Sequence, residues 1–460
     1  MFEQDTIAAI ATSSKNGSIS IIRVSGEKAI SSVSSIFFNE KNEPIDLENQ
    51  PTHTVRYGFI CDGEKKIDEV LVLVMRAPRS YTAEDVVEIH CHGGHYICQL
   101  ILNLLLHYGV NIAEPGEFTK RAFLNGRLDL SQAEAVMDVI QSKSQMSLNN
   151  SLSQLKGSVR EKIEKLREIL LEDVAYLEAA LDDPEHISLD NFSSNIERHV
   201  NKLLEETEHL LLNSNNGRLI KEGIRTVIIG RPNVGKSSFL NCILREDRAI
   251  VTDEPGTTRD TLEEDVVIGS TLLHLIDTAG IRKTSQKVET IGIEKTKKSL
   301  QSADFVIAVI DGSKELTAED QEIFQLIESY LGVILLNKKD LPVKVSMDDI
   351  NTYSDKHVIS FSAETGEGLQ QLEEYLNKQI LSQNIETTQE LYITNARQKE
   401  ALLQTKESLL KVKESIELGM PEDLYAIDLT NAYESLGKII GETVEEDIIE
   451  KIFKDFCMGK

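Results

Sequence analysis

A glycine-rich loop of the kind that cradles phosphates constrains the fold of this chain more than any other feature. It reads GRPNVGKS over residues 230–237 and lies between an apolar run at 225–229 and a helical pattern. Its glycines let successive backbone N–H groups curl around phosphates, while Lys236 is placed to reach the β- and γ-oxygens and Ser237 to ligate Mg²⁺. The motif requires a strand before it and a helix after it, so the sequence predicts an α/β nucleotide-binding domain.

Two more motifs, each at the end of an apolar run, indicate that the nucleotide is GTP. The DTAG run at 277–280 offers a carboxylate to the magnesium shell and a backbone N–H to the γ-phosphate. The NKKD run at 337–340 offers Asp340, whose carboxylate can accept from N1–H and the 2-amino group of guanine, a pair of donors that adenine lacks. Leaving those acceptors buried and unpaired would be costly, so the motif selects GTP over ATP. The predicted GTP contacts are Asn233, Val234, Gly235, Lys236, Ser237, Ser238, Thr252, Asp253, Glu254, Pro255, Gly256, Thr257, Thr258, Asp277, Thr278, Ala279, Gly280, Asn337, Lys338, Asp340, Ser362 and Ala363.

The groups that activate water are predicted to differ from those of Ras-like proteins. Ras-like proteins place a glutamine directly after the glycine of the second switch, where this chain has Ile281, which neither donates nor accepts a hydrogen bond. The first switch, at 252–260, is rich in hydroxyls and backbone carbonyls. We therefore expect Thr258 to close onto Mg²⁺ and the oxygens of this loop to enclose a monovalent cation.

The order of patterns along the chain predicts one domain inserted into another. Residues 1 to about 120 have a mixed α/β pattern, and strands alternate with helices again from 224 to about 379. A long helical pattern, with an apolar stripe from Leu152 to Leu181, precedes the second α/β region, and another follows it. The polar stretch 213–218 is predicted to be a linker, and the two helical blocks are predicted to pack as one bundle. Strands are expected at 18–24, 69–75, 85–90, 225–229, 271–276, 305–310, 332–336 and 357–360, and a helix at 96–108.

Charge and cysteine content narrow the classes of function and location. The balance of 49 basic against 76 acidic residues gives a net charge of −27, so an RNA substrate would need a local basic patch or a basic partner. Five scattered cysteines argue against a disulfide framework. Glu3 and Asp5 stand where an export signal would be basic, and no apolar run is long enough to span a membrane. We therefore expect a cytoplasmic protein with no membrane partner.

Long motifs outside the nucleotide-binding region carry a resemblance to a known family. They are DTIAAIAT at 5–12, YTAEDVVEI at 81–89, HGG at 92–94, PGEFTKRAFLNGRLDL at 115–130 and CMGK at 457–460. With the GTPase motifs, they make the chain similar to the MnmE (TrmE) family of tRNA-modification GTPases over nearly its whole length. Met458 departs from the isoleucine that is usual in the family, an exchange of one apolar side chain for another.

The resemblance implies a multidomain α/β plus all-α architecture with three parts. The first is an N-terminal α/β domain at 1–120, which binds folate and forms a dimer. The second is a discontinuous helical domain made of 121–217 and 383–460. The third is an inserted Ras-like P-loop G domain at 218–382.

The resemblance also implies a function carried out with a partner. In the family, a homodimer joins a flavin-dependent protein (MnmG, also called GidA), which carries the FAD, in a heterotetramer. Together they install an aminomethyl or carboxymethylaminomethyl group on C5 of the wobble uridine of certain tRNAs. The implied one-carbon donor is 5-formyltetrahydrofolate or a related tetrahydrofolate, and the implied GTPase is stimulated by K⁺.

Roles carried over from the family fall on three groups of residues. The K⁺ ligands would be Asn233, Thr252, Glu254 and Thr257, and the Mg²⁺ ligands Ser237 and Thr258. The catalytic residues would be Lys236, Asp277 and Glu289, the last of which would orient the attacking water in place of the missing glutamine. The folate ligands would be Arg23, Glu88, Arg127 and Lys460, where a carboxylate suits the donors of a pterin and cations suit a glutamyl tail.

Several alternatives stay open at this stage. His90, Cys91, His92, His95 and Cys98 invite a metal interpretation, although their spacing fits no standard zinc pattern and strand alternation explains them. Cys457 is a candidate redox or nucleophilic residue; lipidation fits poorly, because Lys460 is the wrong last residue. Two rival functions are a ribosome-assembly GTPase that binds rRNA and a non-catalytic folate-binding scaffold with a GTP-driven dimerisation switch.

Overall fold

The structure is a computed structural model in which two compact units are formed by segments distant in sequence. The first unit comprises residues 1–137, 155–168 and 433–460, and the second 138–154 and 169–432. In the part of the chain that the structure describes, no helix is both long and apolar enough to cross a membrane. The described residues are 5–12, 17–183, 186, 192–245, 264–276, 299–381, 391–442, 444, 446–454, 456 and 459.

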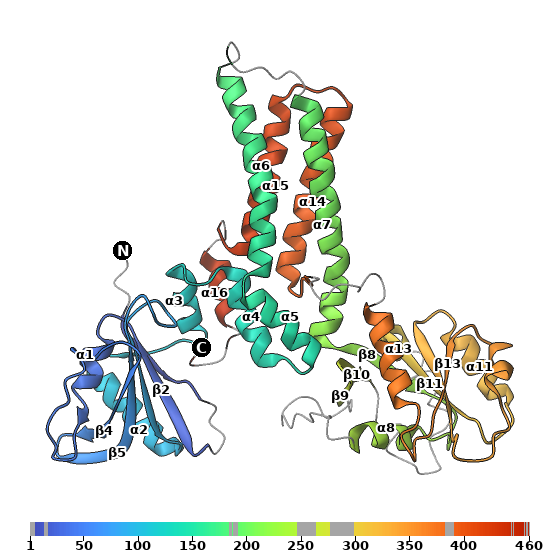
Figure 1. The fold of residues 1–460 in the computed structure, drawn as a ribbon, viewed down its shortest axis with the longest axis horizontal. Helices are drawn as coiled ribbons and strands as arrows, with labels where there is room; N and C mark the ends of the chain where they lie inside the picture. Colours follow the sequence, from blue (N-terminus) through green and yellow to red (C-terminus); the bar gives the residue numbers. More distant parts are fainter. Residues whose placement is uncertain are drawn as a thin grey trace. The chain divides into compact units, whose positions relative to one another are not determined.

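A seven-stranded sheet forms the core of the N-terminal α/β part (Figure 1). Its order is β3-β4-β5-β6-β2-β1-β7, and every neighbouring pair is antiparallel except β1–β7. Helices α1 (Ala29–Ser34) and α2 (His95–His107) pack on the face where alternate strand residues such as Val24, Val72 and Ile89 are buried. The strands are β1 (Ile7–Ile10), β2 (Ile19–Ser25), β3 (Phe37–Phe38), β4 (Thr54–Asp62), β5 (Lys65–Met75), β6 (Val86–His92) and β7 (Asn111–Ile112).

Two helices replace the single apolar stripe predicted from Leu152 to Leu181. The chain breaks at Gly157, whose φ is +97°, between α5 (Gln145–Leu155) and α6 (Ser158–Asp182). Leu152 and Leu181 are exposed, so the stripe is correct within α6, from Val159 to Leu177, and not at its two predicted ends. The other helices of the bundle are α4 (Leu130–Gln141), α7 (Phe192–Glu222), α14 (Ala396–Glu417), α15 (Asp423–Ile440) and α16 (Glu446–Lys454).

The predicted linker at 213–218 is wrong, because α7 runs through it without a break. The polar side chains there are used in packing instead of turning the chain. Asn213 Nδ2 donates to the carbonyl of Leu391, and Gly217 lies so close to the Ile393 carbonyl that a Cβ there would stand 2.1 Å from the oxygen. The helix is therefore continuous up to the first strand of the next sheet, and the expected boundary at 217–218 falls inside α7.

A six-stranded sheet forms the core of the G domain. Its order is β13-β12-β11-β8-β10-β9, in which all pairs are parallel except β9–β10 at one edge. Apolar side chains of α8 and α13 cover one face, and those of α11 and α12 cover the other, which confirms the predicted doubly covered sheet (Figure 1). The elements are β8 (Ile224–Ile229), α8 (Lys236–Arg245), β9 (Glu264–Ile268), β10 (Thr271–Leu275), β11 (Phe305–Asp311), α11 (Ala318–Ile327), β12 (Gly332–Asn337), α12 (Met347–Asn351), β13 (His357–Ser360) and α13 (Leu369–Leu381).

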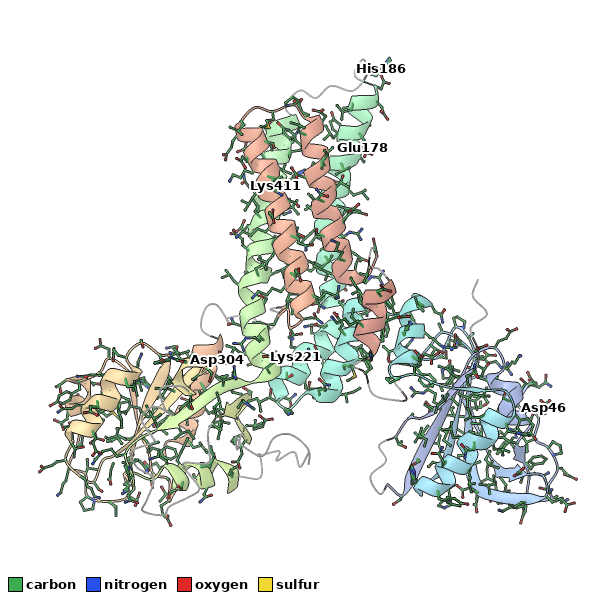
Figure 2. All side chains as sticks on the ribbon, turned by 180° about the vertical axis from the view of Figure 1, so that it is seen from behind. Asp46, Glu178, His186, Lys221, Asp304 and Lys411 are labelled. Carbon is green, nitrogen blue, oxygen red and sulfur yellow. The ribbon has the colours of Figure 1, made fainter. Side chains whose placement is uncertain are left out.

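The G domain is continuous with the helical bundle through α7. Lys221, in the last turn of α7 and labelled in Figure 2, places its Nζ 2.8 Å from Asp138 Oδ1 on α4. Thr394, just before α14, donates to the other oxygen of the same carboxylate at 3.2 Å. One buried carboxylate thus ties together the segments that lead into and out of the G domain.

Candidate nucleotide and folate sites

The phosphate-binding loop joins β8 to α8, as the sequence predicts. Gly235 has a φ of +105°, and a Cβ there would lie 2.2 Å from Asn337 Nδ2. Asn233 also has a left-handed backbone, with a φ of +63°. Only glycine fits at position 235, because any side chain would be strained and would displace Asn337.

Lys236 is held inside the loop that it is expected to serve. Its Nζ donates to the carbonyls of Gly230 at 2.6 Å and Arg231 at 2.7 Å. Burial lowers the pKa of Lys236 to about 8. An ammonium group in this setting, poorly solvated and bonded to neutral carbonyls of the loop, gains from the arrival of a phosphate.

The guanine-recognition motifs are cross-linked to the phosphate-binding loop by Asn337. This buried side chain donates through Nδ2 to the Val234 carbonyl at 2.8 Å and accepts at Oδ1 from Ala363 N–H at 3.0 Å. Next to it, Ser362 Oγ donates to Asp340 Oδ1 at 2.6 Å, which orients the carboxylate. Three motifs far apart in the sequence therefore form one rigid edge of the sheet.

Many of the predicted site residues lie outside the described residues. They are Thr252, Asp253, Glu254, Pro255, Gly256, Thr257, Thr258, Asp277, Thr278, Ala279, Gly280, Glu289, Cys457 and Lys460. Their assigned roles stay predictions. The described residues supply the base and phosphate sides of the nucleotide site.

The three predicted folate residues that the structure describes, Arg23, Glu88 and Arg127, lie near Tyr81 in the N-terminal part. Arg23 and Glu88 are cross-strand partners whose side chains pair at 2.8 Å, and the Arg23 guanidinium lies 5.3 Å from the Tyr81 ring centroid. Arg127 lies 5.1 Å from the same ring and donates to the Tyr81 carbonyl at 2.8 Å. Arg23 Nη1 also donates to the carbonyl of Gly459 at 3.4 Å, so the end of the chain reaches this cluster.

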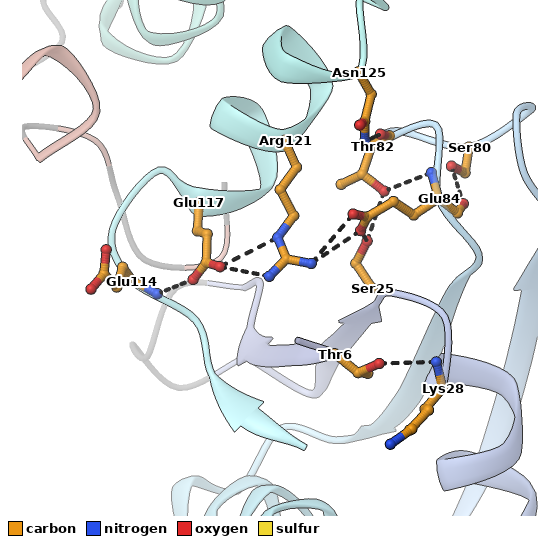
Figure 3. A network of polar contacts seen from close by, with 10 residues as sticks. All are labelled: Thr6, Ser25, Lys28, Ser80, Thr82, Glu84, Glu114, Glu117, Arg121 and Asn125. Carbon is orange, nitrogen blue, oxygen red and sulfur yellow. Dashed lines mark hydrogen bonds and ion pairs between the residues drawn. The ribbon is translucent and has the colours of Figure 1, made fainter. Parts of the chain in front are cut away.

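A buried polar network next to Tyr81 was not foreseen from the sequence. Arg121, on α3 (Glu117–Leu124), pairs with Glu84 and with Glu117, and Ser25 Oγ donates to Glu84 at 2.7 Å (Figure 3). Asn125 Nδ2 donates to the Thr82 carbonyl at 2.7 Å. These bonds fix the loop that carries Tyr81. The signal was present in the motifs at 81–89 and 115–130, where the charges of opposite sign are brought together only by folding.

Comparisons with known proteins agree over the whole chain. The family model "GTP-binding protein TrmE N-terminus" matches residues 6–127, and the model "MnmE helical domain" matches residues 130–457. A tRNA modification GTPase MnmE from Lachnoclostridium phytofermentans is 52% identical over 456 residues, which cover 99% of each chain. Proteins of the same name from Alkaliphilus oremlandii and Clostridioides difficile are 45% and 44% identical, with 100% of each chain covered.

The chain belongs to the MnmE family. It is accordingly a GTP hydrolase, and its N-terminal, helical and P-loop G domains are those that the resemblance implied. A solved structure, that of the G domain of the T. maritima FeoB iron transporter, is 22% identical and covers 34% of this chain and 97% of its own. Its TM-score of 0.26 is too low to support any conclusion.

Two ion pairs of this MnmE-family G domain were missed in the sequence. Lys338 Nζ bonds Asp311 Oδ2 at 2.6 Å and the Asn233 carbonyl at 3.0 Å, and Arg231 Nε bonds the fully buried Asp320 at 2.7 Å. Burial alone would raise the pKa of Asp311, but hydrogen bonds from Lys338 and Ser313 hold it below its usual value. Asp311 directly follows the apolar run at 305–310, a position that pointed to the sheet edge where the nucleotide motifs meet.

The structure does not support a metal site at the His/Cys motif. Among the described residues, no group of three or more His, Cys, Asp or Glu side chains is placed to hold an ion. Cys91 and Cys98 are buried, with their sulfurs 3.9 Å apart. Their histidine neighbour His92 points to the opposite side and pairs with Asp68. Strand alternation thus separates the residues that are adjacent in the sequence.

Proposed function

We propose that this chain is a K⁺-stimulated GTPase that modifies tRNA together with a flavin-dependent partner of the MnmG (GidA) type. The pair would add an aminomethyl or carboxymethylaminomethyl group to C5 of the wobble uridine of certain tRNAs. A tetrahydrofolate such as 5-formyltetrahydrofolate would supply the carbon. The working assembly would be a cytoplasmic heterotetramer built on a homodimer, with FAD on the partner alone.

The observation that carries this proposal is the cluster around Tyr81 in a chain 52% identical to a tRNA modification GTPase. The guanidinium groups of Arg23 and Arg127 lie next to the ring of Tyr81. Arg23 bonds Oε1 of Glu88, and the other oxygen, Oε2, lies 3.5 Å from Nε2 of His90. Cations and a carboxylate beside an aromatic ring suit a folate, which is a flat ring with donors at one end and carboxylates at the other. Arg23, Glu88, Arg127 and Lys460 would hold it.

The nucleotide side of the proposal rests on the loop around Lys236. Ser237 and Thr258 would ligate Mg²⁺, and Asn233, with Thr252, Glu254 and Thr257, would ligate K⁺. The left-handed backbone of Asn233, held by Lys338, projects this residue from a fixed loop. Glu289 would orient the attacking water and K⁺ would supply the positive charge that an arginine finger provides elsewhere.

The decisive experiment is mass analysis of tRNA nucleosides from a strain that lacks this protein. We expect loss of the C5-modified wobble uridines and their recovery when the wild-type gene is returned. A normal nucleoside profile with defective ribosomal subunits would favour the ribosome-assembly alternative. A normal profile with no ribosome defect would favour the folate-binding scaffold.

A further inference from the structure

The hairpin of β9 and β10 connects the two stretches that the sequence assigns to the γ-phosphate side of GTP. Its first strand begins at Glu264, six residues after Thr258, and its second ends at Leu275, two residues before Asp277. The turn of the hairpin is bonded to α13 of the G domain, because the hydroxyls of Ser270 and Thr271 both donate to Asn377 Oδ1 at 3.0 Å. The hairpin is therefore a structural link between both switch regions.

An ion pair joins this hairpin to the helical part of the same unit. Lys143, in the short turn between α4 and α5, places its Nζ 2.8 Å from Asp265 Oδ2. The other oxygen of Asp265 lies 2.7 Å from Nδ1 of His274. The hydrogen bonds from His274 and Lys143 lower the pKa of Asp265 to about 2 against the effect of burial. Because an ionised carboxylate only accepts, His274 donates from Nδ1.

Asp265 is held in place by a bond within the hairpin, whereas its partner Lys143 is partly exposed to solvent. Asp265 and His274 face each other across the β9–β10 ladder, so their bond lies within the hairpin. Lys143 is 42% exposed and bridges the turn after α4 to the hairpin. Beside it, Met146 of α5, Ile220 of α7 and Leu272 of β10 line one small apolar pocket. An ionic contact and an apolar contact therefore connect the hairpin to the segment around α5 and to the end of α7.

We propose that Lys143 is a positioning residue for the GTPase. Through its ion pair with Asp265, it holds the β9–β10 hairpin in position. Through the same contact, the nucleotide state alters the order of α5. Coupling of this kind is reciprocal, so an effect of nucleotide on α5 implies an effect of the α5 side on the nucleotide site. A partly exposed ion pair contributes little to stability, so it can be removed without unfolding either element. The inference rests on the GTPase alone and is independent of the proposed tRNA and folate chemistry.

The test compares backbone hydrogen exchange of residues 143–155 in the full-length protein with GDP and with GDP plus aluminium fluoride. In the wild type, we expect at least a five-fold difference in exchange rate between the two states. Lys143→Met should reduce this difference to less than two-fold and lower kcat for GTP about five-fold, with KM within two-fold. Lys143→Arg, which keeps the charge and the reach, should restore both.

The matched control is Lys406→Met, which removes an ion pair of equal length within the bundle, with Glu208 at 2.8 Å. It should leave both readouts at wild-type values. An unchanged kcat, or an exchange difference that survives in Lys143→Met, overturns the proposal. So does an equal loss in Lys406→Met, or a wild-type protein in which nucleotide leaves α5 unaffected.

Discussion

At the scale of single residues, the polar side chains of the nucleotide site are oriented by protein partners. Asn337 bridges two loops, Ser362 holds Asp340, and Lys236 is bonded to two loop carbonyls. Ordering a side chain costs conformational entropy, and here that cost is met during folding rather than on binding. The affinity for GTP should therefore depend steeply on individual groups.

Asp340→Asn should weaken GTP binding roughly a hundredfold, because charge-assisted bonds to guanine are lost and an amide N–H faces the base. The variant should prefer xanthosine triphosphate, whose 2-oxo group accepts from an amide. Titration of the wild type and the variant with GTP and with xanthosine triphosphate measures the two affinities and shows whether the preference is reversed. Ser362→Ala is the control: it removes only the hydroxyl that orients Asp340, and its loss should be a few-fold. Unchanged GTP affinity in Asp340→Asn would refute the assignment.

GTP affinity should fall as the pH rises above about 8. The free protein has a Lys236 pKa of about 8 because of burial, and a bound phosphate would raise it. Binding then takes up a proton above pH 8 and weakens up to tenfold per pH unit until the bound-state pKa is passed. Kd measured from pH 6.5 to 9.5 (a range of roughly three units) tests this, with Lys236→Arg as the control that stays charged throughout. Identical profiles for the two proteins would contradict the prediction.

At the scale of elements, the terminal helix α16 is anchored by aromatic side chains. Phe453 and Phe456 are buried, with their ring centroids 5.0 Å apart, in a cluster with Phe123 and Leu130. Beyond this anchor, Gly459 has a φ of +82° and lies against the Ile10 carbonyl, where a Cβ would stand 2.6 Å from the oxygen. Glycine is thus required for the chain end to pass between β1 and Arg23.

Deletion of residues 457–460 should impair folate binding and tRNA modification while sparing GTP turnover. The contact of Gly459 with Arg23 would be lost, whereas the aromatic anchor and the G domain would stay intact. Formyltetrahydrofolate affinity and wobble-uridine content measure the first effect, and GTP turnover in K⁺ measures the second. Full folate affinity and full modification would show that the tail has no role. A collapse of GTP turnover would mean that the tail instead supports the helical part.

At the scale of the whole molecule, an acidic chain carries one nucleotide site and one cluster suited to folate in separate parts. The net charge of −27 means that tRNA would have to be held by a local basic surface or by the proposed partner. In the described residues, Asp138 and α7 join the G domain to the helical segments that it interrupts in sequence. The G domain is thus connected to the helical segments of the same unit through α7 and through the contacts of Asp138.

GTP turnover by the full-length protein should be faster in K⁺ than in Na⁺ at equal ionic strength. Ile281 stands where the usual water-orienting glutamine would be, and a cation bound near Asn233 would supply the positive charge that an arginine finger provides elsewhere. We expect at least a tenfold difference, a lower bound set below the ~10²–10⁴-fold contribution of a positioned catalytic group. Rates in K⁺, Na⁺ and Rb⁺ measure it, and Rb⁺, nearer K⁺ in size, should stimulate more than Na⁺. Equal rates in all three salts would exclude the cation site.

Local patterns in the sequence predicted those parts of the fold that depend on neighbours along the chain. Buried parallel strands appear as continuous apolar runs, and the predicted strands at 225–229, 305–310 and 332–336 are confirmed by β8, β11 and β12. Composition misled where polar residues serve packing, as in α7, whose stretch at 213–218 was predicted to be a linker. Propensity is a weak guide there because tertiary contacts override it.

By itself, the sequence determined the class of protein: the P-loop G domain and the membership of the family follow from residues in short motifs, and the assignment of Asp340 to guanine is a prediction from the same motifs. Only the tertiary structure decided which distant groups meet. Tens to hundreds of residues separate the two members of each of these pairs in the sequence: Arg121 and Glu84, Arg231 and Asp320, Lys143 and Asp265, and Gly459 and Arg23. The physical reason is that motif chemistry is set by the types of nearby residues, whereas long-range pairing depends on how burial of apolar faces brings whole elements together.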